Sequence, residues 1–140
     1  MLLDVKLMGL AVALSLLAVP ASAETFDHSP FDELLKKHVV KGMVDYESFA
    51  QAGAFKDYLT SLEHADVSKL SDRERLAFWI NAYNAYTIEL INKYEERASI
   101  KNIREGVGFQ RTKGPWKEPI VKAAGKTYSL DEVENAIIRK

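Results

Sequence analysis

The sequence has 140 residues, of which 28% are charged, with three His and no Cys. This length predicts one domain, because domains typically contain ~100–200 residues. Without Cys the chain has no disulfide, no thiolate metal site and no thiol nucleophile. The net charge of −1 gives no overall attraction to nucleic acid or to an anionic membrane.

Residues 1–23 have the pattern of a secretory signal peptide. An uncharged, mostly apolar run ends in Ala-Ser-Ala at 21–23, which is the A-x-A pattern of a cleavage site. The run is too short for a membrane span, which needs ~20 apolar residues. Asp4 departs from the pattern, because the residues before the apolar run are normally positive, and the alternative is an uncleaved amphipathic or buried helix. We expect export to the periplasm or secretion, with a domain at 24–140.

The first part of this domain is predicted to be helical. Ser29 and Pro30 have the residue types of a helix start, apolar residues then recur at helical spacing, and Gly42 is expected to end the helix. A short extended piece at 43–46 follows. A second helix is predicted over about 48–64.

The strongest helical pattern lies at 72–98. Ser71 and Glu74 form the signature of a capping box, and no Pro or Gly interrupts the segment. On a helical wheel Arg75, Glu89 and Lys93 share one narrow stripe, while apolar and aromatic residues fill most of the rest. A helix that is apolar on most sides is packed on several faces. We therefore expect the other elements to surround this helix.

The last part of the chain combines a loop, a hairpin and a helix. Gly and Pro punctuate 106–119. Two short extended runs flank Ala124-Gly125 and predict a β-hairpin. Ser129 and Glu132 form a second capping-box signature before a final helix. The fold class predicted is mainly α, of the α+β type, with helices around one central aromatic-rich helix and a small β-hairpin.

Three polar side chains of the central helix are candidates for a site. Glu74 and Asn81 project from nearly the same side of the helix, and Asn84 lies further round. A carboxylate and two amides on an apolar-lined face could hold a substrate or orient a base. They could equally be structural, because buried amides must be hydrogen-bonded and Glu74 has a role in the capping box.

Other chemistry is weakly indicated. His28, His38 and His64 show no metal-ligand spacing, so we expect no metal and no cofactor. Neither a nucleophile elbow nor a phosphate-binding loop is present. Residues 101–126 carry seven bases and two acids beside Trp116, which is either a solvated loop and hairpin or a surface for an anionic ligand or acidic partner. The bases are Lys101, Arg104, Arg111, Lys113, Lys117, Lys122 and Lys126.

The segment 74–85 reads E-R-L-A-F-W-I-N-A-Y-N-A. It resembles the hallmark helix of the family called domain of unknown function 547 almost letter for letter. Further matches keep the family's order and extend the resemblance over nearly all of 24–140. They are Val44-Asp45-Tyr46, Pro115-Trp116, Gly125-Lys126-Thr127-Tyr128-Ser129-Leu130-Asp131 and Glu134-Asn135-x-Ile137-Ile138-Arg139.

The resemblance implies a mixture of helices and a small sheet. Family domains usually continue beyond the Ile-Ile-Arg position with a Pro-containing turn and a stretch that bears His and Cys. That stretch has invited comparison with Cys-His-acid hydrolases of papain-like or transglutaminase-like shape, and plant members are linked to scaffold proteins with leucine zippers. The resemblance therefore implies an incomplete family domain, in which Glu74 is the matched candidate for a catalytic orienting acid.

From these observations we expect a binding or interaction module without catalysis of its own. A protein partner or a second copy would dock on the aromatic face that an incomplete domain leaves open. The candidate binding residues are Asn81, Asn84, Trp79, Tyr83 and Trp116. One alternative is a truncated Cys-His hydrolase whose nucleophile and base lie beyond residue 140. Another is a plain helical domain in which the motif serves core packing.

Overall fold

The computed structural model describes residues 24–103 and 114–140, so the predicted leader at 1–23 lies outside it. The helices of the described residues are α1 (Ser29–His38), α2 (Tyr46–Gln51), α3 (Gly53–Glu63), α4 (Asp72–Lys93) and α5 (Leu130–Glu132), which continues into the π-helix η5 (Val133–Ile138). Two antiparallel pairs of strands accompany them, β1 (Val39–Val40) with β2 (Met43–Val44) and β3 (Pro119–Ala123) with β4 (Lys126–Ser129). The prediction of a mainly helical fold with a small β part is confirmed.

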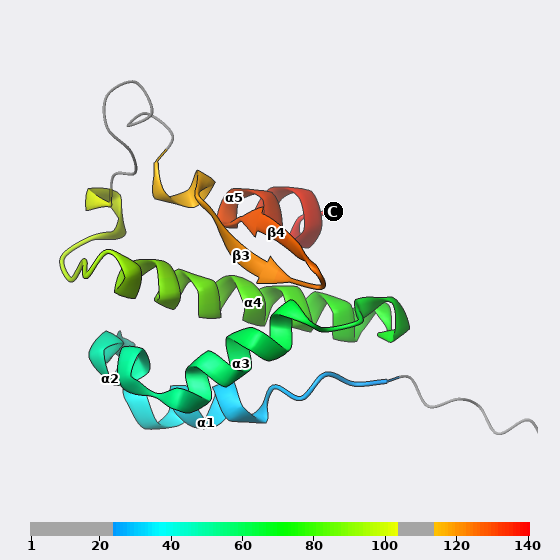
Figure 1. Ribbon diagram of the computed structural model, residues 1–140, viewed down its shortest axis with the longest axis horizontal. Helices are drawn as coiled ribbons and strands as arrows, with labels where there is room; N and C mark the ends of the chain where they lie inside the picture. The colour runs from blue at the N-terminus through cyan, green and yellow to red at the C-terminus, as the bar shows by residue number, and fades with distance from the viewer. Residues whose placement is uncertain (1–23, 104–113) are drawn as a thin grey trace, which may run out of the picture.

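Helix α4 runs through the middle of the molecule (Figure 1). Helices α1, α2 and α3 lie on one side of it, and the β3–β4 hairpin and α5 lie on the other. The residues of α4 that are buried point to both layers, as expected for a central helix; they are Phe78, Trp79, Ala82, Ala85, Tyr86, Ile88, Leu90 and Ile91. No helix of the described residues is long and apolar enough to cross a membrane.

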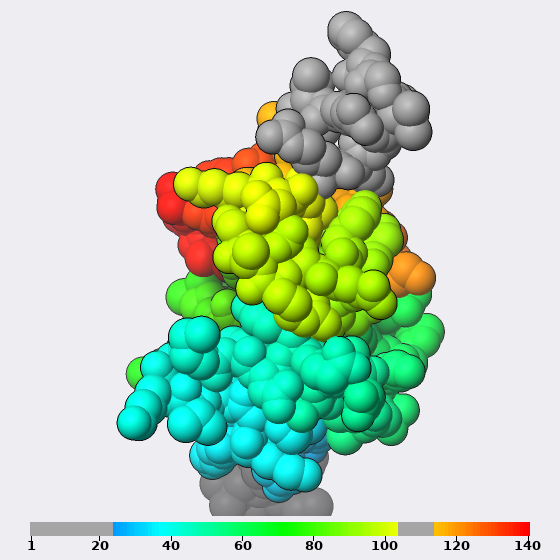
Figure 2. Space-filling model, turned by 90° about the vertical axis from the view of Figure 1, so that its left-hand side faces the viewer, coloured from blue at the N-terminus to red at the C-terminus, as the bar shows by residue number. Residues whose placement is uncertain are grey.

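The sequence pattern predicts that the central helix continues to Ala98, but α4 ends at Lys93. Glu95 adopts a left-handed backbone conformation with φ of 52°, which turns the chain out of the helix. Arg97 then folds back toward α2, where its guanidinium lies 3.5 Å from the Glu47 carboxylate and over the Tyr46 ring. Figure 2 shows the segment after α4 packed against α2 and its neighbours. Tertiary contact with α2 thus replaces the last turn of the predicted helix.

The second predicted helix, over 48–64, is two helices. Ala52 is extended, with φ of −76° and ψ of 113°, and separates α2 from α3. The bend lets Phe49 from α2 and Phe55 from α3 meet edge to face at 5.1 Å in the core. Burial of both rings outweighs the propensity for one continuous helix, because each aromatic side chain buries a large apolar area.

The first helix likewise ends earlier than predicted, at His38 instead of Gly42. The chain pairs β1 with β2 through a turn at Lys41 and Gly42, both of which have positive φ. The predicted extended piece at 43–46 is extended only at Met43–Val44, because Asp45 caps α2 by accepting a hydrogen bond from the Ser48 amide at 3.1 Å.

The β3–β4 hairpin forms around Ala124 and Gly125 as predicted. Its turn is attached to the end of α3, because the amides of Ala124 and Gly125 donate to the carbonyls of Leu62 and Glu63 at 2.9 and 2.8 Å. Its strand β3 is attached to α4 through the Tyr86 hydroxyl, which donates to the Lys122 carbonyl at 2.8 Å. The hairpin is therefore held on the helices by side-chain and main-chain hydrogen bonds as well as by apolar contact.

We predict that Tyr86→Phe lowers the free energy of unfolding by about 1 kcal/mol, because it removes the partly buried hydrogen bond from the Tyr86 hydroxyl to the Lys122 carbonyl. The measurement is urea unfolding followed by circular dichroism. The matched control is Tyr128→Phe on the same hairpin, whose hydroxyl makes no hydrogen bond with the described residues. Equal loss of stability in both variants would contradict the assigned role of the Tyr86 hydroxyl.

Candidate functional site

The carboxylate of Glu74 is not used to cap its own helix. The Ser71 hydroxyl accepts a hydrogen bond from the Glu74 amide at 3.3 Å, but within the described residues no return bond from the Glu74 side chain is formed. The second predicted capping box is complete, since the Ser129 amide donates to Glu132 at 2.7 Å and the Glu132 amide donates to the Ser129 hydroxyl at 3.2 Å. The prediction of a capping box at Ser71 is therefore only half right, and the half-buried Glu74 carboxylate is available for another contact.

The charge of Glu74 acts on His28, which belongs to the segment before α1. Burial lowers the pKa of His28, and the negative charge of Glu74 opposes that shift more than that of Asp27 does. The Nδ1 atom of His28 is hydrogen-bonded to the Tyr58 hydroxyl at 2.7 Å. Its Nε2 atom is buried and has no hydrogen-bond partner among the described residues.

Aromatic rings enclose this imidazole. Phe26 lies 4.8 Å from the His28 ring and 5.1 Å from the Phe78 ring, and burial together with Asp27 raises the pKa of Tyr58. A carboxylate, a neutral imidazole and a phenol in apolar surroundings can hold and orient a proton. Sequence spacing could not identify this group, because its members come from three segments that meet only in the fold.

The two amides do not join Glu74 in one cluster. Asn81 is half-buried, and its Nδ2 donates to the Ala77 carbonyl of its own helix at 3.0 Å. Asn84 is exposed and makes no side-chain hydrogen bond within 24–103 and 114–140. Glu74 and Asn81 do lie on related sides of α4, but no hydrogen bond links the three residues in that part of the chain.

The three aromatic candidates occupy different places. Trp79 is buried between Phe78 at 5.2 Å and Tyr128 at 5.3 Å, both edge to face. Tyr83 is half-buried and donates to the Glu134 carboxylate at 3.4 Å, while burial and the Glu134 charge raise its pKa. Trp116 is half-buried and packs against the core. Of these, Tyr83 and Trp116 keep part of their surface open to solvent.

One side of α4 is left uncovered by both layers. Leu76 and Ile80, one helical turn apart, are 45% and 42% exposed. Arg73, Tyr83 and Asn84 border them on the same side of the helix. We call these five residues the α4 strip. The polar stripe of the helical wheel lies on another side of α4. The side chains of Arg75 and Lys93 are partly exposed there, Glu89 is half-buried, and Lys93 pairs with the buried carboxylate of Glu118.

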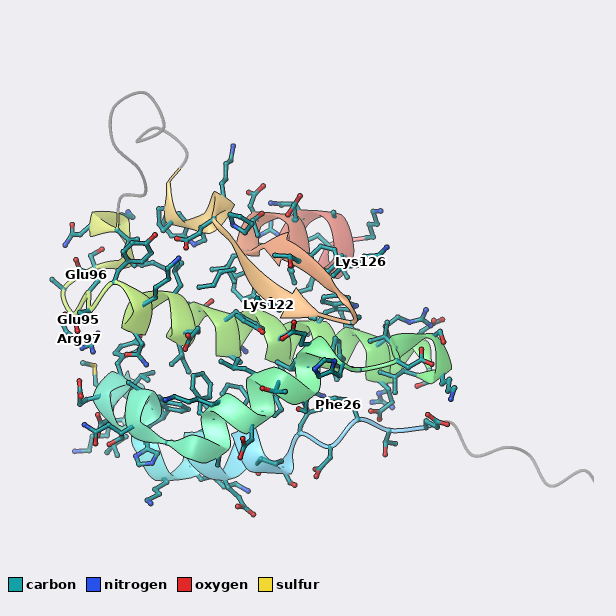
Figure 3. The ribbon with its side chains drawn as sticks, viewed as in Figure 1. Phe26, Glu95, Glu96, Arg97, Lys122 and Lys126 are labelled. Atoms are coloured by element: carbon teal, nitrogen blue, oxygen red, sulfur yellow. The ribbon has the colours of Figure 1, made fainter. Side chains whose placement is uncertain are left out.

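The basic segment is only partly described. Arg104, Arg111 and Lys113 lie outside the described residues. Lys122 and Lys126 are exposed on the hairpin, on the opposite side of α4 from α1 and α2, whereas Glu95, Glu96 and Arg97 lie at the far end of α4 (Figure 3). In the described part of the chain no three His, Asp or Glu side chains form a group that could hold a metal ion.

We predict that Glu74→Gln lowers the pKa of His28 further, because it removes the negative charge that opposes the effect of burial. The measurement is a titration of the imidazole resonances by NMR. The matched control is Asp72→Asn, an exposed acid in the same first turn of α4, for which no change is expected. An unchanged or higher His28 pKa in Glu74→Gln would show that the Glu74 carboxylate does not act on this imidazole.

Comparison with known proteins gives one family. A family model described as "Protein of unknown function, DUF547" matches residues 67–140, slightly more than half of the chain. The match covers α4, the hairpin and α5, and it begins after α3. No curated protein and no solved structure matches the chain.

Proposed function

The chain belongs to the DUF547 family, whose function is unknown, and we propose a function for it from the structure. We propose that the protein is a non-catalytic interaction module, and that it pairs with a second copy of itself through the α4 strip. The observation that carries this proposal is the exposure of Leu76 and Ile80 on the helix around which the rest of the fold is built. Isolated exposed apolar residues are common. Two of them one turn apart on the central helix, next to a half-exposed Tyr83, form a continuous apolar surface.

A helix strip of this kind is suited to a copy of itself. Apolar side chains on one helix fill the grooves of another when the two surfaces meet, and a two-fold pair uses the same patch on both partners. Arg73 and Asn84 border the apolar residues and supply the polar rim that interfaces normally have. The strip is short, so the pairing should be weak and dependent on concentration.

Catalysis receives less support from the site. Glu74 and His28 provide an acid and an imidazole, but the sequence contains no Cys to act as a thiol nucleophile, and the side chain hydrogen-bonded to His28 is the phenol of Tyr58. A catalytic role for Glu74 as an orienting acid, and binding roles for Asn81, Trp79 and Trp116, stay predictions.

We predict that the wild-type protein self-associates reversibly at high micromolar concentration and that Leu76→Gln with Ile80→Gln weakens the association at least about tenfold, because it removes the apolar contact. The measurement is sedimentation velocity over a concentration series. Gln is chosen because it favours helix nearly as well as Leu, so the fold is expected to persist.

The control for this experiment is Val40→Gln with Met43→Gln. These two residues are 64% and 75% exposed on the β1–β2 hairpin, so they are apolar and more exposed than Leu76 and Ile80 but lie elsewhere. The control variant should associate like the wild type. A wild-type monomer at every concentration, or equal effects of the two double variants, would refute the proposed function.

We also propose that the chain is exported, on the strength of the apolar run and the A-x-A pattern at 21–23. We predict that Ala23→Phe blocks processing, because the residue before the cleavage site must be small, whereas Ser22→Phe at the variable position is processed normally. Intact mass spectrometry of the exported protein should give a mature chain that begins at Glu24. Retention of the full-length mass in the wild type would contradict this proposal.

A further inference from the structure

A hollow of about 360 Å³ lies between the segment that precedes α1 and helix α3. Figure 3 shows Phe26 on that segment, beside α3 and α4. Most of its surface is apolar. Phe26, Pro30 and Ala54 line it, with the buried Tyr58 ring behind them. Its volume falls in the range of ~300–1,000 Å³ that is usual for small-molecule sites.

The rings that line the hollow are held in place from behind. Phe26 packs edge to face on Phe78 at 5.1 Å and on Tyr58 at 6.2 Å. Tyr58 stacks on Phe31 at 5.0 Å with an angle of 9° between the rings, and its hydroxyl is hydrogen-bonded to His28. A ligand would therefore meet the Phe26 ring, which Tyr58 and Phe78 already hold in position, so that little ordering is needed on binding.

The charge of the hollow has one sign. Asp27 and Asp57 line it, and none of the described residues that line it is a lysine, an arginine or a histidine. The Asp27 carboxylate accepts hydrogen bonds from the Ser29 amide at 2.9 Å and the Ser29 hydroxyl at 2.6 Å, which lower its pKa and keep it ionised. Both bonds use Oδ1. Asp57 is exposed and makes no hydrogen bond or ion pair with the described residues.

A second hollow adjoins the first and differs from it in the charge of its lining residues. It shares Pro30 and Ala54 with the first and is lined on its other side by Glu33, Leu34 and Lys37 from α1. Because an acid and a base face this second hollow together, it does not select for the charge of a ligand. The end bounded by Asp27 and Asp57 is the end that does.

We propose that the hollow between Phe26 and Tyr58 is a binding site for a small organic ammonium ion with an apolar substituent. The positive head would lie between the carboxylates of Asp27 and Asp57, where the Phe26 ring adds cation–π attraction, and the substituent would cover Pro30 and Ala54. An anion is repelled by both carboxylates, and a neutral ligand gains only the apolar contact. None of the residues of the α4 strip lines this hollow, so the site is independent of the proposed self-association.

The proposal is tested with three probes of similar size and different charge. Phenethylammonium is the cation, 2-phenylethanol the neutral analogue and phenylacetate the anion. Titration of each into the full chain at low salt is followed by NMR, with the resonances of Phe26, His28 and Tyr58 as reporters. Phenethylammonium is expected to bind most tightly of the three. Its affinity should fall as salt is added, because salt screens its attraction to the carboxylates.

Variants then separate charge from shape. Asp57→Asn should weaken the binding of phenethylammonium about fivefold, as expected for the loss of one partly exposed ion pair, and leave 2-phenylethanol unchanged. The matched control is Asp32→Asn, an exposed acid of α1 outside the hollow, which should alter neither. Phe26→Leu keeps an apolar side chain at this position, but it should lower the affinity for phenethylammonium about threefold because the cation–π attraction is lost.

The circular dichroism spectrum and the dispersed NMR spectrum of each variant establish that it is folded. The proposal is overturned if 2-phenylethanol binds as tightly as phenethylammonium, if the shifted resonances lie away from the hollow, or if folded Asp57→Asn binds the cation like the wild type. Failure of the self-association experiment would leave these results unaffected, since the two surfaces share no residue.

Discussion

The burial of α4 on two sides at once is the constraint on which the rest of the structure depends. Phe78 and Trp79 are consecutive, and because side chains of neighbouring helix positions diverge, they serve different layers. Phe78 meets Phe26 at the N-terminal layer, and Trp79 meets Tyr128 of the hairpin. The contact between α3 and the hairpin turn closes the two layers together on one side. The loss of either layer would expose large aromatic surface on the central helix.

The same arrangement explains why one strip of α4 stays open. The layers meet where α3 touches β3, and the polar Glu89 lies half-buried beside that contact. On the opposite side no element of the described residues bridges them, so Leu76 and Ile80 remain exposed. The exposed face of the helix is thus set by where its neighbours attach.

The part of the chain before the family match contributes to both candidate sites. Residues 67–140 match the family. Yet His28, on which the charge of Glu74 acts, and Tyr58, which is hydrogen-bonded to His28, come from the segment and helix that precede the match. The proposed ammonium site is built from that same N-terminal part. Residues 24–70 carry a net negative charge, whereas the basic segment at 101–126 carries a net positive charge. The part of the chain before the match therefore adds polar and aromatic groups beside the hallmark helix, which itself carries Glu74 and most of the α4 strip.

The sequence by itself determined the features that depend on a few neighbouring residues. The amide-capping Ser71, the complete capping box of Ser129 and Glu132, and the hairpin around Gly125 could all be predicted, because each is fixed by local hydrogen bonds or by backbone conformation. The central position of α4 could be predicted from its nearly all-round apolar surface. Family membership followed from the hallmark motif.

Only the tertiary structure decided the rest. The break at Ala52, the side of α4 that stays exposed and the meeting of Glu74 with His28 involve segments far apart in the chain. Local propensity differs by fractions of a kcal/mol per residue, whereas burial of one aromatic side chain is worth ~1.5–3 kcal/mol. Packing between distant segments therefore overrides local preference, and no pattern within one segment records which distant partner it will meet.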